Sequence, residues 1–144
     1  MLVQQILKAK GDDTVITIKP GTLVSDAARI LAERRIGGLV VSEDGKQIQG
    51  ILSERDIVRS LAVRGATCLS DRIDDMMTRN PVCCARGDTS DQVLTRMTEG
   101  RFRHMPVVED GELVGIVTIG DVVSSRLSEL AMEKDALQGM IMGH

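Results

Sequence analysis

Aromatic residues are almost absent from this chain of 144 residues: Phe102 is the single phenylalanine, and there is no tryptophan or tyrosine. The hydrophobic core must therefore consist of valine, isoleucine, leucine, alanine and methionine. Rings on which single-stranded bases could stack are missing. The net charge is −3, and acidic and basic residues alternate along the chain, which disfavours a broad basic surface. We therefore expect no nucleic-acid partner.

Long apolar runs are also missing. No run approaches the roughly 20 residues that cross a bilayer, and the first five residues lack the basic start and apolar core of a signal peptide. We expect a cytoplasmic protein without a membrane partner. The three cysteines, Cys68, Cys83 and Cys84, form no C-x-x-C motif, and an odd number favours reduced thiols. His104 and His144 have no metal-ligand spacing, so no metal site is expected.

What the sequence does contain is a unit that occurs twice. The run Gly-Ile-Leu-Ser at 50–53 is followed three residues later by Asp56, and the run Gly-Ile-Val-Thr at 115–118 is followed three residues later by Asp121. The leading glycines and the aspartates have the same spacing of 65 residues, from 50 to 115 and from 56 to 121. Self-similarity at a fixed period indicates a repeat architecture.

Each copy predicts the same order of elements, which is strand, helix, strand, strand, helix. β-Branched and apolar runs indicate the strands, and apolar residues at helical spacing indicate the helices. The expected elements are a strand at 14–18, a helix at 22–35, a hairpin at 39–52 and a helix from 53, then their counterparts at 82–85, 88–99, 103–117 and 118–138. Short helices are expected at 3–8 and 73–78. The predicted fold class is therefore α/β (α+β).

The connector from 64 to 71 is the expected boundary between the copies. The first unit then comprises residues 1–66 with the N-terminal helix, the second comprises 67–130, and a helical tail follows at 131–144. The tail carries more apolar surface than a single chain needs, at Ala136, Leu137, Met140, Ile141 and Met142. A homodimer is one explanation and a frayed helix end is the other.

The pairs Ser53 with Asp56 and Thr118 with Asp121 have two interpretations. A hydroxyl at a helix start with an acid three residues later resembles a capping box, with Asp in place of Glu. A strand that ends at a helix N-terminus is also where α/β folds hold polar ligands. There the carboxylate can accept hydrogen bonds from a ribose diol, and the amides can meet a phosphate. The two roles are compatible.

The doubled motif, together with Arg-His-Met-Pro-Val-Val at 103–108, resembles a pair of CBS domains, the tandem known as a Bateman module. The resemblance covers roughly residues 1 to 130. It implies two tandem β-α-β-β-α CBS repeats packed sheet to sheet with pseudo-twofold symmetry. Family members commonly bind adenine nucleotides in two clefts between the repeats, and many dimerise.

The resemblance also implies which residues face a nucleotide. Asp56 and Asp121 match the family's ribose-binding aspartate, and Ser53 and Thr118 match its hydroxyl position. The remaining ligand-facing positions lie on the first and second strands of each copy: Ile16, Thr17, Ile18, Gly38, Leu39, Val40, Val82, Cys83, Cys84, Met105 and Pro106.

The two copies differ where charge matters. Arg103 and His104 stand opposite Gly37 and Gly38, and Arg55 stands opposite a glycine in the second copy. The arginine and histidine side chains are either ordinary surface and packing residues or phosphate ligands, for which the arginine fork is suited. A cation at a helix start, such as Arg55, is unfavourable unless an anion lies nearby. We expect two inequivalent sites.

The predicted function is a regulatory sensor that binds AMP, ADP, ATP or a dinucleotide such as NAD. It would act through dimerisation or on a protein target in trans, and it would not be an enzyme. An alternative is a dimerisation or interaction module with vestigial clefts and no nucleotide binding. An enzyme would need Cys83 or Cys84 as a nucleophile with His104 as its base, or Asp56 and Asp121 as a hydrolytic pair. The chain has neither a P-loop nor a G-x-G-x-x-G motif.

Overall fold

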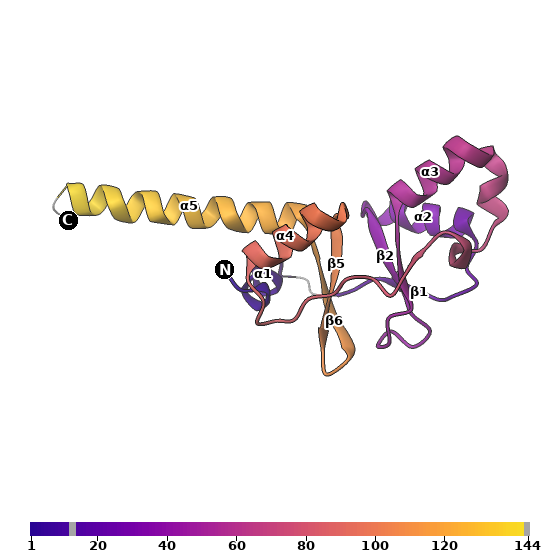
Figure 1. Ribbon diagram of the computed structural model, residues 1–144, viewed down its shortest axis with the longest axis horizontal. Coiled ribbons are helices and arrows are strands. Elements are labelled where there is room, and N and C mark those ends of the chain that lie inside the picture. The colour runs from indigo at the N-terminus through magenta and orange to yellow at the C-terminus, as the bar shows by residue number, and fades with distance from the viewer. Residues whose placement is uncertain (12–13, 143–144) are drawn as a thin grey trace.

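The computed structural model describes residues 1–11 and 14–142 and consists of two units side by side (Figure 1). The elements in chain order are α1 (Val3–Ala9), β1 (Thr17–Ile18), α2 (Val24–Arg34), β2 (Gly38–Val41), β3 (Gly50–Ser53), α3 (Glu54–Arg64), the 3₁₀ helices η1 (Gly65–Ser70) and η2 (Ile73–Asp75), β4 (Thr78–Arg79), α4 (Ser90–Gly100), β5 (His104–Glu109), β6 (Glu112–Thr118) and α5 (Ile119–Ile141).

The first unit is built on a sheet of four strands in the order β1-β2-β3-β4. β1 runs parallel to β2, and β2 and β3 form an antiparallel hairpin in which Leu39 lies opposite Leu52. β4 pairs with β3, with Thr78 opposite Ile51. The helix expected at 73–78 is therefore only the 3₁₀ turn η2, because Thr78 and Arg79 join the sheet instead.

The second unit is built on the antiparallel hairpin of β5 and β6. The strand expected at 82–85 is reduced to one parallel bridge between Cys84 and Val107. Cys84 donates its N–H to the Pro106 carbonyl (3.0 Å) and accepts from the Val108 N–H (2.9 Å). No longer strand forms here because the chain up to Arg79 pairs with β3 of the first unit, and Pro81 has no N–H to donate to a neighbouring strand.

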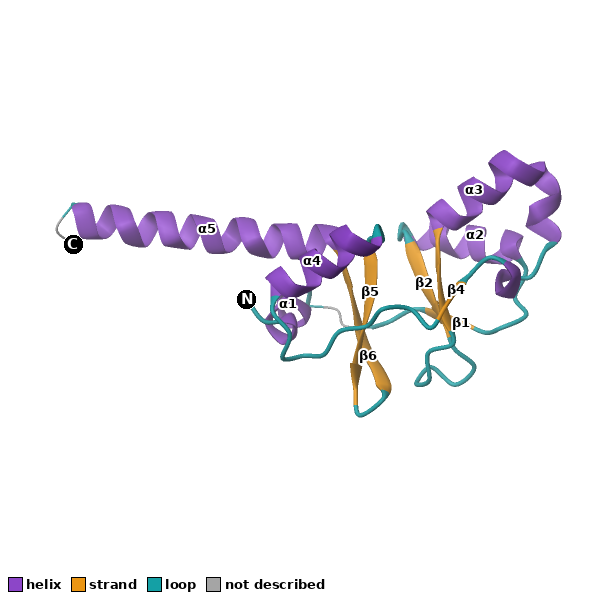
Figure 2. Ribbon diagram, viewed as in Figure 1, coloured by secondary structure: helices purple, strands orange, loops and turns teal. Residues whose placement is uncertain are grey.

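The two sheets face each other in the middle of the molecule, and the helices lie on the outside (Figure 2). Matching backbone bonds follow the repeat. Glu54 N–H donates to the Gly37 carbonyl and Ile119 N–H donates to the Arg103 carbonyl, both at 2.9 Å. The hairpin ends meet where Leu113 N–H donates to the carbonyl of residue 46 (2.8 Å). The fold is the expected pair of repeats packed sheet to sheet.

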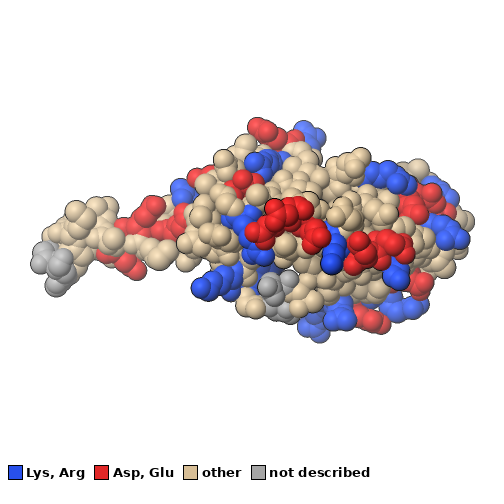
Figure 3. All heavy atoms as spheres, turned by 90° about the horizontal axis from the view of Figure 1, so that it is seen from below, with Lys and Arg blue, Asp and Glu red and all other residues tan. Residues whose placement is uncertain are grey.

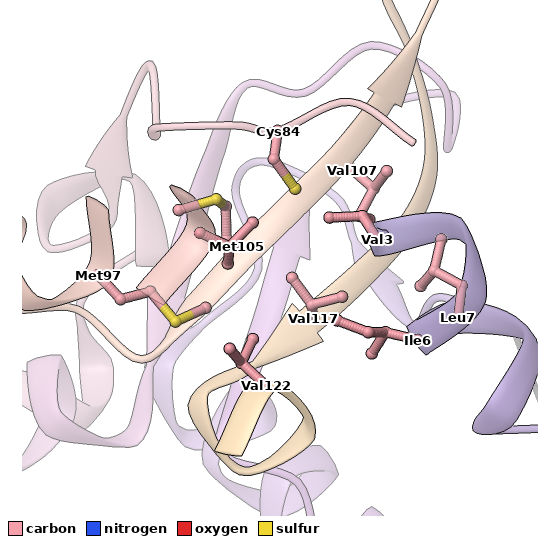
Figure 4. Packing of buried hydrophobic residues seen from close by; sticks show 10 residues of the cluster. Val3, Ile6, Leu7, Cys84, Met97, Met105, Val107, Val117 and Val122 are labelled. Atoms are coloured by element: carbon pink, nitrogen blue, oxygen red, sulfur yellow. The ribbon is translucent and has the colours of Figure 1, made fainter. Parts of the chain in front are cut away.

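The N-terminal helix α1 packs against the second unit, although it precedes the first in sequence. Val3, Ile6 and Leu7 are buried in one cluster with residues of α4, β5, β6 and α5, including Val117 and Val122 (Figure 4). The backbone fixes the contact, because Val3 N–H donates to the carbonyl of residue 88 and residue 90 donates its N–H to the carbonyl of residue 1, both at 2.8 Å.

The segment before the second repeat packs in the same way on the first unit. Ile73 is fully buried in the core of that unit. Its N–H donates to the Thr22 carbonyl, and Val24 N–H donates to the Asp71 carbonyl, both at 2.9 Å. Each unit thus receives the lead segment of the other, an arrangement that we call the reciprocal exchange. The boundary between residues 66 and 67 stays a prediction.

The core contact of α1 can be tested with Leu7→Ala. The Leu7 side chain is 5% exposed and lies over Gly115, where an added Cβ would come within 2.9 Å of Leu7 Cδ2. Removing a buried leucine side chain leaves a cavity, so the free energy of unfolding should fall by about 2–5 kcal/mol in urea denaturation. Val63→Ala, at a side chain that is 85% exposed, is the control and should change it by less than about 0.5 kcal/mol. Equal losses in the two variants would contradict this role of α1.

Candidate functional site

A cavity of about 220 Å³, the first cleft, opens between the two units at the N-terminus of α3. The first unit contributes the end of the turn that precedes β2, together with residues of β3 and α3. The second unit contributes the turn that precedes β5. The lining residues are Gly37, Ile51, Ser53, Glu54, Arg55, Asp56, Arg59, Thr78, Pro81, Val82, Gly100, Arg101, Phe102, Arg103 and His104. The cavity therefore depends on both repeats.

Ser53 and Asp56 form the capping box that their spacing predicts. Ser53 Oγ accepts a hydrogen bond from the Asp56 N–H (3.2 Å), and Asp56 Oδ2 accepts from the Ser53 N–H (2.9 Å). Among the described residues, this cap involves only Oδ2 of the carboxylate. The second oxygen is left for another donor, so capping and ligand binding are compatible at the same side chain.

Four arginines surround this helix start: Arg55, Arg59, Arg101 and Arg103. Within the described ranges 1–11 and 14–142, none of the four forms an ion pair with a carboxylate. The cavity also contains the two acids at 54 and 56, which leaves an excess of positive charge. Such a surplus of positive charge at the N-terminal end of a helix suits a phosphate.

This concentration of cations is local. On the face that Figure 3 shows, acidic and basic side chains alternate over the body, and several acidic ones lie along the projecting helix. The overall net charge is −3. The surface therefore favours a small anionic ligand over a long nucleic-acid track.

His104 lies between the two repeats and lines both clefts. Its ring packs directly against the glycines of the first repeat, where an added Cβ would come within 3.1 Å at Gly37 and 3.0 Å at Gly38. Burial lowers the pKa of His104, and Glu54 opposes that shift only in part. The imidazole is therefore neutral at pH 7. The counterpart of His104 in the first repeat is Gly38, so the first repeat has no side chain at the matching position.

The second cleft, of about 280 Å³, lies at the N-terminus of α5. It is lined by Lys10, Thr14, Val15, Ile16, Arg35, Ile36, Gly37, Gly38, His104, Ile116 and Thr118. Thr118 Oγ1 accepts from the Asp121 N–H (3.1 Å), and Asp121 Oδ2 accepts from the Thr118 N–H (2.9 Å). The capping box is thus the same in both repeats.

The clefts bring together about half of the expected ligand residues. The first cleft contains Ser53, Arg55, Asp56, Val82, Arg103 and His104. The second contains Ile16, Gly38, His104 and Thr118. Asp121 lines a neighbouring cavity between α1 and α5, together with Lys10 and three serines.

The other expected residues do not line either cleft. Leu39, Val40 and Met105 are fully buried, and Pro106 is also buried, because the second strands are covered on both faces. Ile18 and Cys84 belong to the two hydrophobic cores. Thr17 and Cys83 are half-buried outside the cavities. The role of these residues as ligand contacts stays a prediction.

Several cleft residues were not expected from the sequence, namely Glu54, Arg59, Arg101 and Phe102 in the first cleft and Lys10 and Arg35 in the second. Arg59 could have been found, because it follows Arg55 by one helical turn on the same face. Arg35 and Arg101 occupy matching positions and both end a helix in the left-handed region, with φ of 54° and 57°.

The cysteines are poorly suited to nucleophilic catalysis. Burial raises the pKa of the Cys83 thiol, and it raises that of Cys84 to about 12. Thiolate is therefore scarce at neutral pH, whereas a thiol nucleophile needs it. In the described part of the chain, no group of three or more His, Cys, Asp or Glu side chains is arranged to hold a metal. No helix there has the length and apolar composition needed to cross a membrane.

A family model described as the CBS domain matches residues 11–63 and 73–128. Among solved structures, the chain is similar to the CBS-domain containing protein ATU1752 from Agrobacterium tumefaciens, with 42% identity and a TM-score of 0.83 over 88% of this chain and 99% of that one. It is similar to the CBS domain pair of protein MJ0100 in complex with 5′-methylthioadenosine and S-adenosyl-L-methionine, with 31% identity and a TM-score of 0.75 over 90% and 96%. It is also similar to the CBS domain protein PAE2072 from Pyrobaculum aerophilum complexed with AMP, with 26% identity and a TM-score of 0.77 over 92% and 99%.

Among curated proteins, the chain is 32% identical over 148 residues to the CBS domain-containing protein CBSX3, mitochondrial, of Arabidopsis thaliana, covering 98% of this chain and 72% of that protein. It is 33% identical over 124 residues to CBSCBSPB2 from the same plant, but it spans only 23% of that protein's length. The likeness to the longer relatives is thus confined to a small part of them.

The lowered pKa of His104 predicts a pH dependence of stability. The unfolded chain, with an imidazole pKa of about 6.5, binds more protons than the folded one between that value and the lowered pKa. The free energy of unfolding should therefore fall as the pH drops from 7 through 6.5. His104→Gln removes this titration, so its urea denaturation midpoint should change less between about pH 7.5 and 5.5. Identical pH slopes for the two proteins would contradict the assignment.

Proposed function

Because the chain belongs to the CBS-domain family, we propose that it is a regulatory module that binds a phosphate-bearing adenine nucleotide in the first cleft. Solved relatives in complex with AMP, or with 5′-methylthioadenosine and S-adenosyl-L-methionine, support an adenosine ligand. The candidates are AMP, ADP, ATP and NAD. No metal is required by this proposal.

The observation that carries the proposal is the Asp56 carboxylate, of which only Oδ2 serves the cap, beside four arginines that form no ion pair with any described residue. The carboxylate can accept from a ribose hydroxyl while it still caps α3. The arginines favour a ligand that ends in phosphate over one that ends in a sulfonium cation. Apolar surface for the base is available nearby, from Ile51, Pro81 and Val82.

The position of the cleft explains how binding could regulate. Both repeats line it, so a bound nucleotide contacts both and favours the packing of the units that fits it best. A ligand shifts such an equilibrium only by its difference in affinity for the two states. The output would pass to a second copy or to a protein target in trans. The free thiols of the chain fit the reducing cytoplasm, where we place the protein.

The proposal is tested by thermal denaturation with AMP, ADP, ATP, NAD and S-adenosylmethionine. A phosphate-bearing nucleotide at 100 times its dissociation constant should stabilise the protein by about 2.7 kcal/mol. Asp56→Asn keeps an oxygen for the cap but loses the charge, so the fold should persist and the shift should decrease. Asp91→Asn, in the first turn of α4 and outside the clefts, is the matched control. No shift with any nucleotide, or an unchanged shift in Asp56→Asn, would refute the proposal.

The projecting half of α5 favours a second candidate function, that of a dimerisation module. α5 extends well beyond the body of the second unit (Figure 1), and residues 130–138 are all exposed. Helices of about 12 residues are marginal in water without tertiary packing. Five exposed apolar residues recur at intervals of three and four, interrupted by Lys134: Val123, Leu127, Leu130, Leu137 and Ile141. Met132, Met140 and Met142 are also exposed but do not follow this spacing. The five residues lie on a different face from Val122, which packs against the body.

A stripe with this spacing is the seam of a two-stranded coiled coil, and it is complementary to the same stripe on a second copy. We therefore propose a homodimer joined along α5. It is compatible with nucleotide binding, since the stripe lies outside both clefts.

The double variant Leu130→Glu and Leu137→Glu should shift the mass in light scattering from dimer to monomer, because it places like charges in the seam. Val63→Glu, on the exposed surface of α3, is the control and should leave the mass unchanged. A seam variant that remains dimeric would exclude α5 as the interface.

A further inference from the structure

The two clefts differ in the surroundings of the matching aspartates Asp56 and Asp121. In the first cleft, Ser53 and Asp56 line the same cavity. In the second, Thr118 lines the cleft, but Asp121 lines the adjoining cavity, and Lys10 lines both. The Lys10 side chain therefore lies between the second aspartate and the space that a ligand would occupy.

Lys10 binds two acceptors at this position. Its Nζ lies 2.8 Å from Asp121 Oδ2 and donates to the Ile116 carbonyl at 3.0 Å. The Lys10 and Asp121 side chains are 27% and 22% exposed, so the pair is partly shielded from water. Among the described residues, Asp56 in the first cleft has no such cation.

The reciprocal exchange explains why only one cleft has this lysine. Lys10 is the C-terminal cap of α1, and α1 is fixed to the second unit by its buried apolar face. η2 takes the place of α1 on the first unit. The chain after η2 pairs with β3 as β4, at Thr78 and Arg79, and does not deliver an ammonium to Asp56.

We propose that Lys10 is an internal competitor of the ligand in the second cleft. Its ammonium pairs with Oδ2 of the Asp121 carboxylate, the oxygen that also caps α5, and neutralises the charge of that carboxylate, whereas Asp56 has no such cation among the described residues. A nucleotide therefore fills the first cleft first, and it fills the second only when Lys10 leaves Asp121. This inference rests on the proposed nucleotide binding and adds to it an order of occupation.

Lys10→Met tests the proposal, because it keeps the length of the side chain and removes the charge. In calorimetric titration with AMP, the wild-type protein should show one tighter site, with the second weaker or undetected. In Lys10→Met the second site should tighten about tenfold, as expected for loss of a partly exposed ion pair and a charged hydrogen bond, while the first is unchanged. Lys8→Met, in the last turn of the same helix, is the matched control and should behave as wild type.

The results separate the two proposals. If AMP binds the first cleft and Lys10→Met leaves the second site unchanged, Lys10 is no competitor, and the proposed function stands. If Lys10→Met weakens the second site, Lys10 is instead a ligand of the phosphate, which also overturns the inference. If AMP binds neither cleft in either protein, the proposed binding of AMP fails and the inference fails with it.

Discussion

The reciprocal exchange of lead segments is the constraint on which the rest of this structure depends. Each repeat of this size leaves one side of its hydrophobic core open, and each is closed by the segment that precedes the other. Val3 and Leu7 close the second unit, and Ile73 closes the first. Backbone hydrogen bonds at matching positions hold each segment on the unit that it closes. The clefts lie at the N-termini of α3 and α5, close to the turns before β2 and β5, which contain glycine and arginine.

The duplication explains how much could be read from the sequence. Hairpins and helix caps are local, so the spacing of Ser53 and Asp56 was enough to predict the hydrogen bonds that the structure contains. Their recurrence at Thr118 and Asp121 supported the prediction a second time. The packing of α1 on the second unit could not be predicted in this way, because Val3 and Val122 are far apart in the chain and no local pattern connects them. The contact between Lys10 and Asp121 depends on that packing and was missed for the same reason.

The ligand residues expected on the second strands show a different limit. Leu39 and Met105 lie on strands next to the clefts, but the resemblance identified the strand without deciding which way each side chain points. Both side chains are fully buried. The polar residues at the turns line the first cleft, because a charged side chain at a helix start has few directions in which it can avoid burial. Their role as ligand contacts stays a prediction. The two repeats therefore differ in their clefts at polar positions, such as Arg55 against Gly120 and His104 against Gly38.

The position of α1 also has a consequence for synthesis on the ribosome. α1 leaves the ribosome well before β6 and α5, yet the surface that receives it includes Val117 and Val122. The Met1 sulfur even accepts a hydrogen bond from the Ser125 hydroxyl. The first unit can close only after Ile73 has emerged, and the second only after Val117 and Val122 have emerged. Contacts between distant segments slow folding. The apolar face of α1 therefore stays exposed on the nascent chain until β6 and α5 emerge, and chaperones that bind apolar segments have access to it during that interval.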